Sequence, residues 1–190
     1  DQSRGGDQAA QAWRSTLDEP AYRAAAERVR AHIARGEVYQ TNVCRTMRAP
    51  LDPRADLVAL HGRLQVGNPA PYAGIATLGD WSLISSSPER LVRSREGRVE
   101  TRPIAGTRPT ADDPGLEEGR RRDLLANPKE RAEHIMLIDL ERSDLGRICR
   151  AGTVKVDEFM IVETYATVHH IVSNVRGDLR EGVAPGQAIA

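Results

Sequence analysis

The segment from Thr101 to Pro109 most constrains how this chain can fold. Strand-type residues run there into Pro103-Ile104-Ala105-Gly106-Thr107, where two very small residues precede a hydroxyl. Small residues let a ligand approach the backbone closely, although a tight turn without a ligand would have a similar composition. The segment therefore predicts a strand that ends in either a ligand-contacting loop or a tight turn.

A helix with paired carboxylates is predicted about 20 residues further on, from Pro128 to about Leu140. Glu130 and Glu133 lie three residues apart in it, so both project from one helix face. Two such carboxylates can hold Mg²⁺ together with substrate oxygens. The alternative is a solvated face on which both glutamates pair with nearby arginines.

Composition excludes several classes of function. The 190 residues are 39% hydrophobic, which suits one globular core. Lys+Arg and Asp+Glu both number 27, so the basic excess typical of nucleic-acid binding is absent. No apolar run approaches the roughly 20 residues that span a bilayer, and the N-terminus lacks a signal-peptide core. Cys44 and Cys149 make no disulfide framework, so we treat both as packing residues of a cytoplasmic protein.

Hairpins with helices between them predict an α+β fold with antiparallel sheets flanked by helices. Residues 1–17 are expected to be a linker or lead-in, and residues 18–190 the folded domain. Helices are predicted from Asp18-Glu19-Pro20 to Gly36, over 56–65, from about 116 to 125 and over 128–140, with a charged surface loop within 109–120. Strands are predicted over 38–47, 72–78, 81–86, 91–93, 98–104, 153–159 and 167–175, with hairpin turns at Gly79-Asp80 and Arg95-Glu96-Gly97.

Three polar positions alternate along the predicted strand from Val38 to Met47. A period of two places Gln40, Asn42 and Cys44 on one face. Such a row would line a cavity, or face water on an edge strand.

Glu89 and the histidine pair complete the candidate residues. Glu89 follows a strand and a proline, which suits either a general acid or a turn carboxylate bridged to Arg90. His169 and His170 alternate faces of the last strand and lack the partners of a zinc site, so core histidines are expected. Glu133-His134 is not an HExxH motif, which excludes a zincin.

In this order, several segments resemble the chorismate-binding enzymes, a family that includes component I of anthranilate synthase and of aminodeoxychorismate synthase. The matching segments are residues 36–42, 68–72, 86–90, 102–108, 129–146 and 163–173. The resemblance covers about residues 20–180. It implies a large fold in which two antiparallel sheets, flanked by helices, enclose the active site, and this chain would be a partial catalytic domain truncated at its C-terminal side.

The resemblance also implies roles for individual residues. Glu133 matches the Mg²⁺ ligand, with Glu130 in the same carboxylate network. Glu89 matches the acid that assists departure of a hydroxyl group, and His170 the histidine near the reacting ring. The substrate-contacting segment corresponds to Ala105, Gly106 and Thr107.

Gln40 separates the members of this family by chemistry. It lies where the water-adding relatives carry a lysine base, and a glutamine cannot deprotonate water. The ammonia-using activities are left, with chorismate as substrate and a glutamine amidotransferase as partner supplying ammonia. Alanine at 105 matches anthranilate synthases of tryptophan biosynthesis, because many aminodeoxychorismate synthases have lysine there.

The motifs around Gln40, Glu89 and His170 look more like the aminodeoxychorismate branch of folate biosynthesis, which we prefer. The alternative from another class is a non-catalytic module that kept the fold. Ser143, where the family usually has asparagine, and the expected C-terminal truncation motivate that alternative. We expect no turnover from these 190 residues alone.

Overall fold

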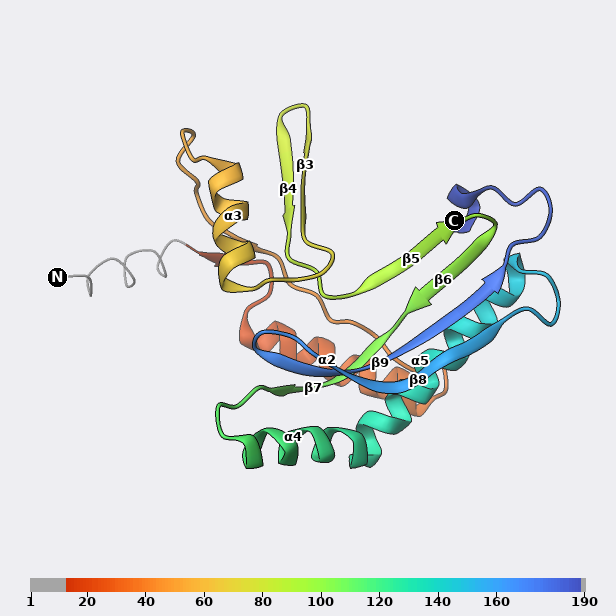
Figure 1. The fold of residues 1–190 in the computed structure, drawn as a ribbon. Coiled ribbons are helices and arrows are strands. Elements are labelled where there is room, and N and C mark those ends of the chain that lie inside the picture. The colour runs from red at the N-terminus through yellow and green to blue at the C-terminus, as the bar shows by residue number, and fades with distance from the viewer. Residues whose placement is uncertain (1–12, 189–190) are drawn as a thin grey trace. The chain divides into compact units, whose positions relative to one another are not determined.

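The computed structural model describes residues 13–188, so most of the predicted lead-in lies outside the described residues. Contacts divide the chain into two units, Asp1–Ala55 and Asp56–Ala190, and each is considered by itself. Figure 1 shows the order of the elements along the chain.

The described part of the first unit contains a helix and a short two-stranded ladder. Its elements are β1 (Arg14–Ser15), α2 (Glu19–Ala34) and β2 (Met47–Arg48). Asp18 caps α2 by accepting the Ala21 N–H at 2.8 Å, and a proline occupies the first turn. Just beyond the helix, Gly36 adopts φ +72°. The predicted start and end of this helix are therefore confirmed.

The predicted strand from Val38 to Met47 was wrong. Only Met47 and Arg48 form a strand, and they pair with Ser15 and Arg14. The rest of the segment has no regular secondary structure. An alternating pattern makes a strand only where a partner accepts and donates its backbone hydrogen bonds, and β1 provides two residues. The polar row expected on one strand face is consequently not formed.

The second unit contains a helix, a hairpin, a five-stranded sheet and two further helices. Its first elements are α3 (Leu57–Gly67), β3 (Gly74–Leu78) and β4 (Trp81–Ser85). The sheet is formed by β5 (Arg90–Arg95), β6 (Arg98–Arg102), β7 (Ile104–Pro109), β8 (Lys155–Thr164) and β9 (Val168–Asp178). The long helices are α4 (Pro114–Ala126) and α5 (Pro128–Ile148), and the described chain ends in a short 3₁₀ turn, η1 (Pro185–Ala188).

Strand β9 organises the sheet. All pairings are antiparallel, and the strand order is β5-β6-β9-β7, with β8 also paired to β9. Strands β6 and β7 follow one another along the same side of β9, at Thr101↔Val175 and Ile104↔Val172. Pro103, which has no N–H to donate, separates them. Both predicted hairpins are confirmed, and Glu96 and Gly97 both have positive φ at the second turn.

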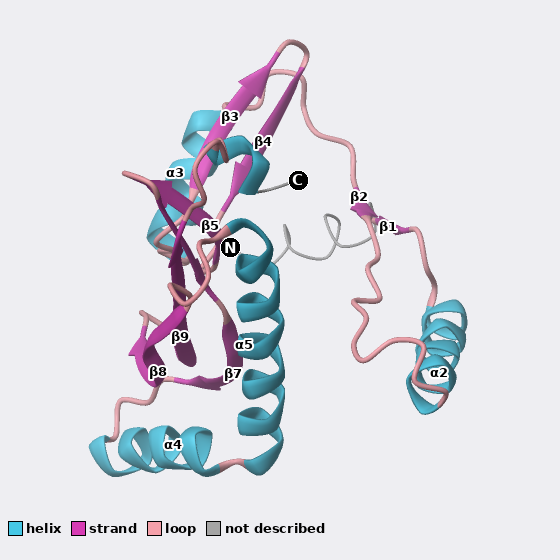
Figure 2. Ribbon diagram, turned by 90° about the vertical axis from the view of Figure 1, so that its right-hand side faces the viewer, coloured by secondary structure: helices cyan, strands magenta, loops and turns pink. Residues whose placement is uncertain are grey.

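Helices α4 and α5 pack against the sheet, as Figure 2 shows for α5 alongside β7, β8 and β9. One core cluster consists of Val99, Ile138, Leu145, Cys149 and Val175. A second consists of Leu124, Met160 and Ile171. Antiparallel sheets covered by helices confirm the predicted α+β class.

Both long helices differ in extent from the predictions. Asp113 caps α4 by accepting the Leu116 N–H at 2.8 Å, so the helix begins at Pro114 and the loop before it is shorter than predicted. Helix α5 continues past Leu140 to Ile148. The continuation follows from Leu145, which extends the buried stripe of Ile138 by two turns.

Both cysteines are free. Cys149 is buried in the core as expected, but Cys44 is exposed, so its assignment as a packing residue was wrong. It lies in the segment that forms no strand and therefore has no sheet face to pack on. Within the described residues, no helix is long and apolar enough to cross a membrane.

Candidate active site

Strand β7 brings most of the candidate residues together. The segment predicted as a loop or tight turn is instead a strand paired with β9, with a register shift between Ala105 and Thr107. Gly106 forms this bulge with φ +77°, a conformation that glycine adopts at little cost. Pairing with β9 explains why the small residues continue the sheet instead of ending it.

Glu89 is bound at the start of β7. Its Oε1 accepts the Ile104 N–H at 2.8 Å, and the residue is exposed. Arg90 instead contacts Glu100 at 3.2 Å and Asn174 at 3.1 Å. The structure therefore favours an oriented, solvent-accessible carboxylate over the alternative of a turn carboxylate bridged to Arg90.

Glu130 packs against the bulge from α5. A Cβ added to Gly106 would lie 3.1 Å from Glu130 Oε2 and 2.9 Å from Leu124 Cδ1. The other carboxylate oxygen, Glu130 Oε1, is 3.4 Å from Arg108 Nη1. Because Gly106 has no side chain, the Glu130 carboxylate can pack directly against the β7 backbone.

His170 reaches β7 from β9. Its Nδ1 lies 3.0 Å from Thr107 Oγ1 and 3.3 Å from the Gly106 carbonyl oxygen. A carbonyl only accepts, so these contacts favour the tautomer with the proton on Nδ1. The neutral ring then has an unprotonated Nε2 that can accept a proton. The ring is buried, as expected for a core histidine.

Glu133 lies one turn beyond Glu130 on α5. Its side chain is 33% exposed, and Oε2 is 3.3 Å from Lys129 Nζ. Both carboxylates therefore have a cationic neighbour, which is the alternative that the sequence left open. Half-buried carboxylate oxygens are nevertheless the donors that Mg²⁺ prefers.

Glu130 and Glu133 are chemically compatible with a magnesium ion that takes its other ligands from water or substrate. No cluster of three or more His, Cys, Asp or Glu side chains able to hold a metal occurs within residues 13–188. Magnesium typically uses one or two protein carboxylates and completes its shell with water and substrate oxygens. The donor set on α5 matches that requirement, so Glu130 and Glu133 remain the predicted ligands.

Gln40 belongs to the first unit, in the exposed segment without regular structure. Its assignment to the reacting ring therefore stays a prediction. The other predicted site residues, Ala105 included, lie in the second unit, where Ala105 is 6% exposed within β7.

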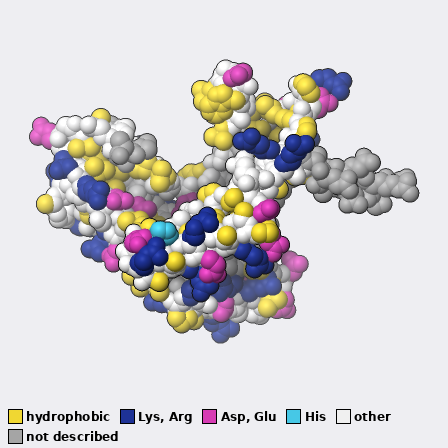
Figure 3. All heavy atoms as spheres, turned by 180° about the vertical axis from the view of Figure 1, so that it is seen from behind, with side chains coloured by type: hydrophobic (Ala, Val, Ile, Leu, Met, Phe, Trp, Pro, Cys, Tyr) yellow, Lys and Arg dark blue, Asp and Glu magenta, His cyan; other side chains and the backbone are white. Residues whose placement is uncertain are grey.

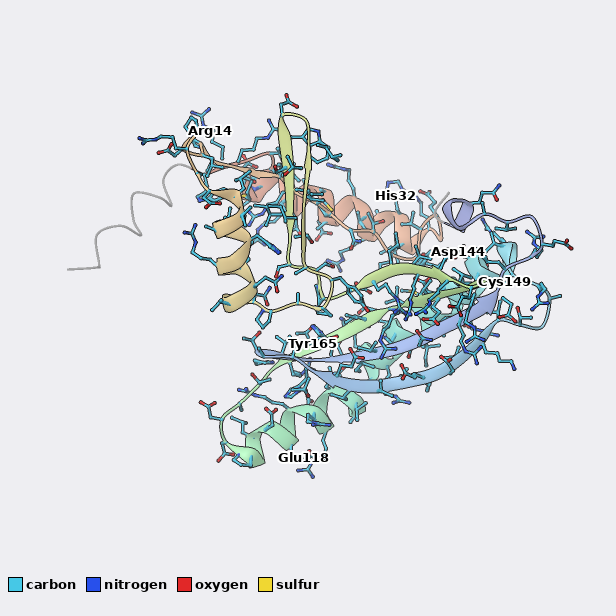
Figure 4. The ribbon with its side chains drawn as sticks, turned by 45° about the horizontal axis from the view of Figure 1, so that its top comes forward. Arg14, His32, Glu118, Asp144, Cys149 and Tyr165 are labelled. Carbon is cyan, nitrogen blue, oxygen red and sulfur yellow. The ribbon has the colours of Figure 1, made fainter. Side chains whose placement is uncertain are left out.

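An ionic chain beside His170 was not predicted from the sequence. Arg102 forms ion pairs with Glu158 and Glu163, and Glu163 Oε2 accepts the Tyr165 hydroxyl at 2.5 Å. The Tyr165 ring lies against His170, with centroids 5.7 Å apart. Figure 4 shows Tyr165 at the opposite end of the sheet from Cys149. The spacing of Glu163 and Tyr165, two residues apart at a strand end, was the available signal.

Charge interactions set the protonation states of Glu163 and Tyr165. Burial pushes the pKa of Glu163 upward, but Arg102 and the Tyr165 hydroxyl outweigh it, so the pKa lies below its usual value. Burial and the bond to Glu163 raise the pKa of Tyr165 to about 12. The phenol therefore stays protonated throughout the physiological range and donates its hydrogen bond to Glu163, while its ring lies against His170.

The fold is that of a chorismate-utilising enzyme. The structure superimposes on anthranilate synthase component I from Streptococcus pneumoniae TIGR4 with a TM-score of 0.82 and 31% sequence identity, covering 93% of this chain and 38% of that one. Aminodeoxychorismate synthase component 1 of Bacillus subtilis is 42% identical over 86% of this chain and 34% of its own length. Anthranilate synthase component 1 of Pseudomonas aeruginosa is 42% identical over 94% of this chain and 36% of its own length.

The sequence model of the chorismate binding enzymes matches residues 2–190, and the chain belongs to that family. The predicted family is thereby confirmed. The chain spans about a third of the length of the curated relatives it matches.

Proposed function

We propose that the complete gene product aminates chorismate with ammonia to give 4-amino-4-deoxychorismate, acting as a component 1 with a glutamine amidotransferase that supplies the ammonia. Relatives at 42% identity carry the names of both ammonia-using enzymes, aminodeoxychorismate synthase and anthranilate synthase. The names of the relatives therefore support the substrate class, and the product rests on the motifs around Gln40, Glu89 and His170.

The observation that carries this proposal is the convergence of side chains on β7. Glu89 is bonded to Ile104, Glu130 packs on Gly106, and His170 is bonded to Thr107. Two carboxyl groups and an imidazole thus meet along four consecutive backbone positions, although they come from three distant parts of the sequence. Convergence of acid–base groups on one short segment is what a catalytic site requires.

Each group then has a defined task in the amination. Glu89 in its acid form donates a proton to the leaving hydroxyl as the ring C–O bond breaks, and water departs. Ammonia supplies the electron pair for the new C–N bond, and the resulting ammonium loses a proton to the Glu89 carboxylate. His170, anchored through Nδ1, presents Nε2 toward the ring.

Glu130 and Glu133 would hold the magnesium ion, which when bound neutralises the carboxylate of the substrate and orients it. Arg108 and Lys129 balance the two glutamates in its absence.

Anthranilate formation is a second candidate because of Ala105. By resemblance, many aminodeoxychorismate synthases carry a lysine at this position that attacks the ring. The alanine side chain offers no nucleophile, and Ala105 is buried in β7. In the anthranilate route, ammonia attacks the neighbouring ring carbon and pyruvate is lost.

Product analysis of the complete gene product with chorismate, Mg²⁺ and ammonium tests the proposal. We expect a product that yields p-aminobenzoate only after a separate lyase is added. Anthranilate fluorescence without a lyase would establish the second candidate instead. Absence of any product, together with loss of Mg²⁺-dependent chorismate binding, would favour a non-catalytic module. The control is Glu133→Ala, which should abolish Mg²⁺-dependent binding.

A further inference from the structure

The first turns of α5 are held to the sheet by a polar contact. Of the buried residues in α5, Ile138 and Leu145 belong to the apolar cluster around Val175, whereas His134 is nearer the N-terminal end. His134 is fully buried, and its Nε2 lies 2.7 Å from Ser173 Oγ on β9. The buried contact between β9 and the end of the helix that carries Glu130 and Glu133 is thus a hydrogen bond.

Ser173 joins three elements through one hydroxyl. Besides His134 on α5, its Oγ accepts the Met160 N–H of β8 at 2.9 Å. Met160 has φ +51°, in the left-handed region that side chains other than glycine rarely adopt. It lies where the register between β8 and β9 shifts. The same hydroxyl therefore holds a strained backbone turn and the start of α5 against β9.

A histidine at position 134 lowers stability if its only role is to fill space in the core. Its Nδ1 is buried without a hydrogen-bond partner in the described part of the chain. A buried polar atom without a partner lowers stability, so an apolar side chain of similar volume would serve packing better. The geometry of the bond, more than its contribution to stability, accounts for a histidine here.

Because His134 is close to Glu130 and Glu133 on α5, its bond to Ser173 can control where their carboxylates lie. Glu130 lies one helical turn before it, and Glu133 is the adjacent residue. A rotation of α5 by about 20° would move a carboxylate that lies about 5–6 Å from the helix axis by about 2 Å. Metal coordination does not tolerate such a shift, because ligands must be held within about 0.5 Å.

Strand β9 carries both Ser173, the partner of His134, and His170. Ser173 is three residues from His170, which is bonded to Thr107. Figure 2 shows α5 running beside β9, the strand that carries both Ser173 and His170. The bond from His134 to Ser173 therefore ties the metal-binding face of α5 to the strand that presents His170.

We propose that His134 and Ser173 are positioning residues that fix the rotation of α5, and with it the Glu130 and Glu133 carboxylates, relative to His170. This inference rests on the proposed function, because it assumes that these carboxylates bind Mg²⁺. Neither residue needs to touch substrate or metal.

The test compares His134→Leu, Ser173→Ala and the double variant with Ile138→Val, all in the complete gene product. Ile138 is buried one turn further along α5 and makes no polar contact with β9, so it reports packing alone. Mg²⁺ affinity is measured by calorimetry with chorismate present, and stability by thermal melting.

We expect Mg²⁺ affinity to fall about tenfold or more in His134→Leu and in Ser173→Ala, as for other residues that orient metal ligands. The double variant should lose no more than the larger single loss, because both changes break the same bond. His134→Leu should melt within about 3 °C of wild type, whereas Ile138→Val should melt lower with unchanged Mg²⁺ affinity.

Wild-type Mg²⁺ affinity in Ser173→Ala would overturn the proposal, and this variant still decides if His134→Leu does not fold. Parallel loss of affinity and stability in all variants, Ile138→Val included, would overturn it in favour of a packing role. A wild-type protein that binds Mg²⁺ and chorismate but forms no aminated product overturns the proposed function alone. A wild-type protein that binds no Mg²⁺ overturns both.

Discussion

At the scale of single residues, β7 is notable for the variety of its partners. Successive positions receive the Glu89 carboxylate, the Glu130 side chain and the His170 imidazole. Glycine suits the bulge at position 106, because its φ of +77° strains other residues and an added Cβ would crowd Leu124 and Glu130. The residue without a side chain therefore determines how closely Glu130 approaches the strand.

Gly106→Ala should lower stability by about 1–3 kcal/mol through backbone strain and further through the clash with Leu124 and Glu130. Displacement of Glu130 should also weaken Mg²⁺ binding. Gly152→Ala is the matched control, since Gly152 has the same φ of +77° with no atom within 4 Å of the added Cβ. Denaturant titration of both variants separates strain from crowding, and equal losses in the two would contradict the crowding argument.

At the scale of elements, local signals, hairpin turns included, could be read from the sequence, whereas the pairing of segments far apart in the chain could not. Helix caps such as Asp18 and the glycine at the second hairpin turn act within a few residues, so their elements could be predicted. The face shared by Glu130 and Glu133 follows from helical periodicity in the same way. Whether Val38–Met47 pairs with another strand depends on residues far away in the sequence, so the local pattern cannot predict it.

In the candidate site, too, the contacts between distant residues could not be predicted from local sequence patterns. The contacts from Glu89 to Ile104 and from His170 to Thr107 join residues 15 and 63 positions apart. They arise from the sheet register and from the bulge at Gly106. A sequence pattern indicates which residues carry the chemistry, but the register of β7 on β9 determines which of them meet.

The close approach of α5 to the end of β9 can be tested at Gly177. A Cβ added there would lie 2.6 Å from Cys149 Sγ and 3.2 Å from Val154 Cγ2. Gly177→Ala should therefore lower the free energy of unfolding by about 1–3 kcal/mol, the usual effect of overpacking. Combining it with Cys149→Ala should restore at least about 0.5 kcal/mol, because the new methyl group occupies the vacated space.

Urea denaturation of the two single variants and the double variant measures this coupling. Gly146→Ala, an open position on α5, serves as the control and should not destabilise the protein. Strictly additive losses at Gly177 and Cys149 would show that the two sites do not touch.

At the scale of the whole molecule, charge is balanced. The 27 basic and 27 acidic residues cancel, and Figure 3 shows both signs interspersed on the face it presents. A net charge near zero leaves little global repulsion to drive unfolding when pH changes moderately. The pH dependence of stability should then come from a few buried groups whose pKa values differ from those of the unfolded chain.

His134 should dominate that dependence in mildly acidic solution. Burial lowers its pKa from 6.5 to about 4, so the folded protein keeps the ring neutral while the unfolded chain takes up a proton. Stability is fully present above pH 6.5 and is lost as pH falls toward 4, by up to about 3 kcal/mol. Denaturation of the complete gene product at pH 7 and pH 4.5 should show this loss, and His134→Leu should show less of it. Because Glu163 and the other histidines are common to both proteins, parallel stability curves for wild type and His134→Leu would mean that the folded protein admits the proton to His134 after all.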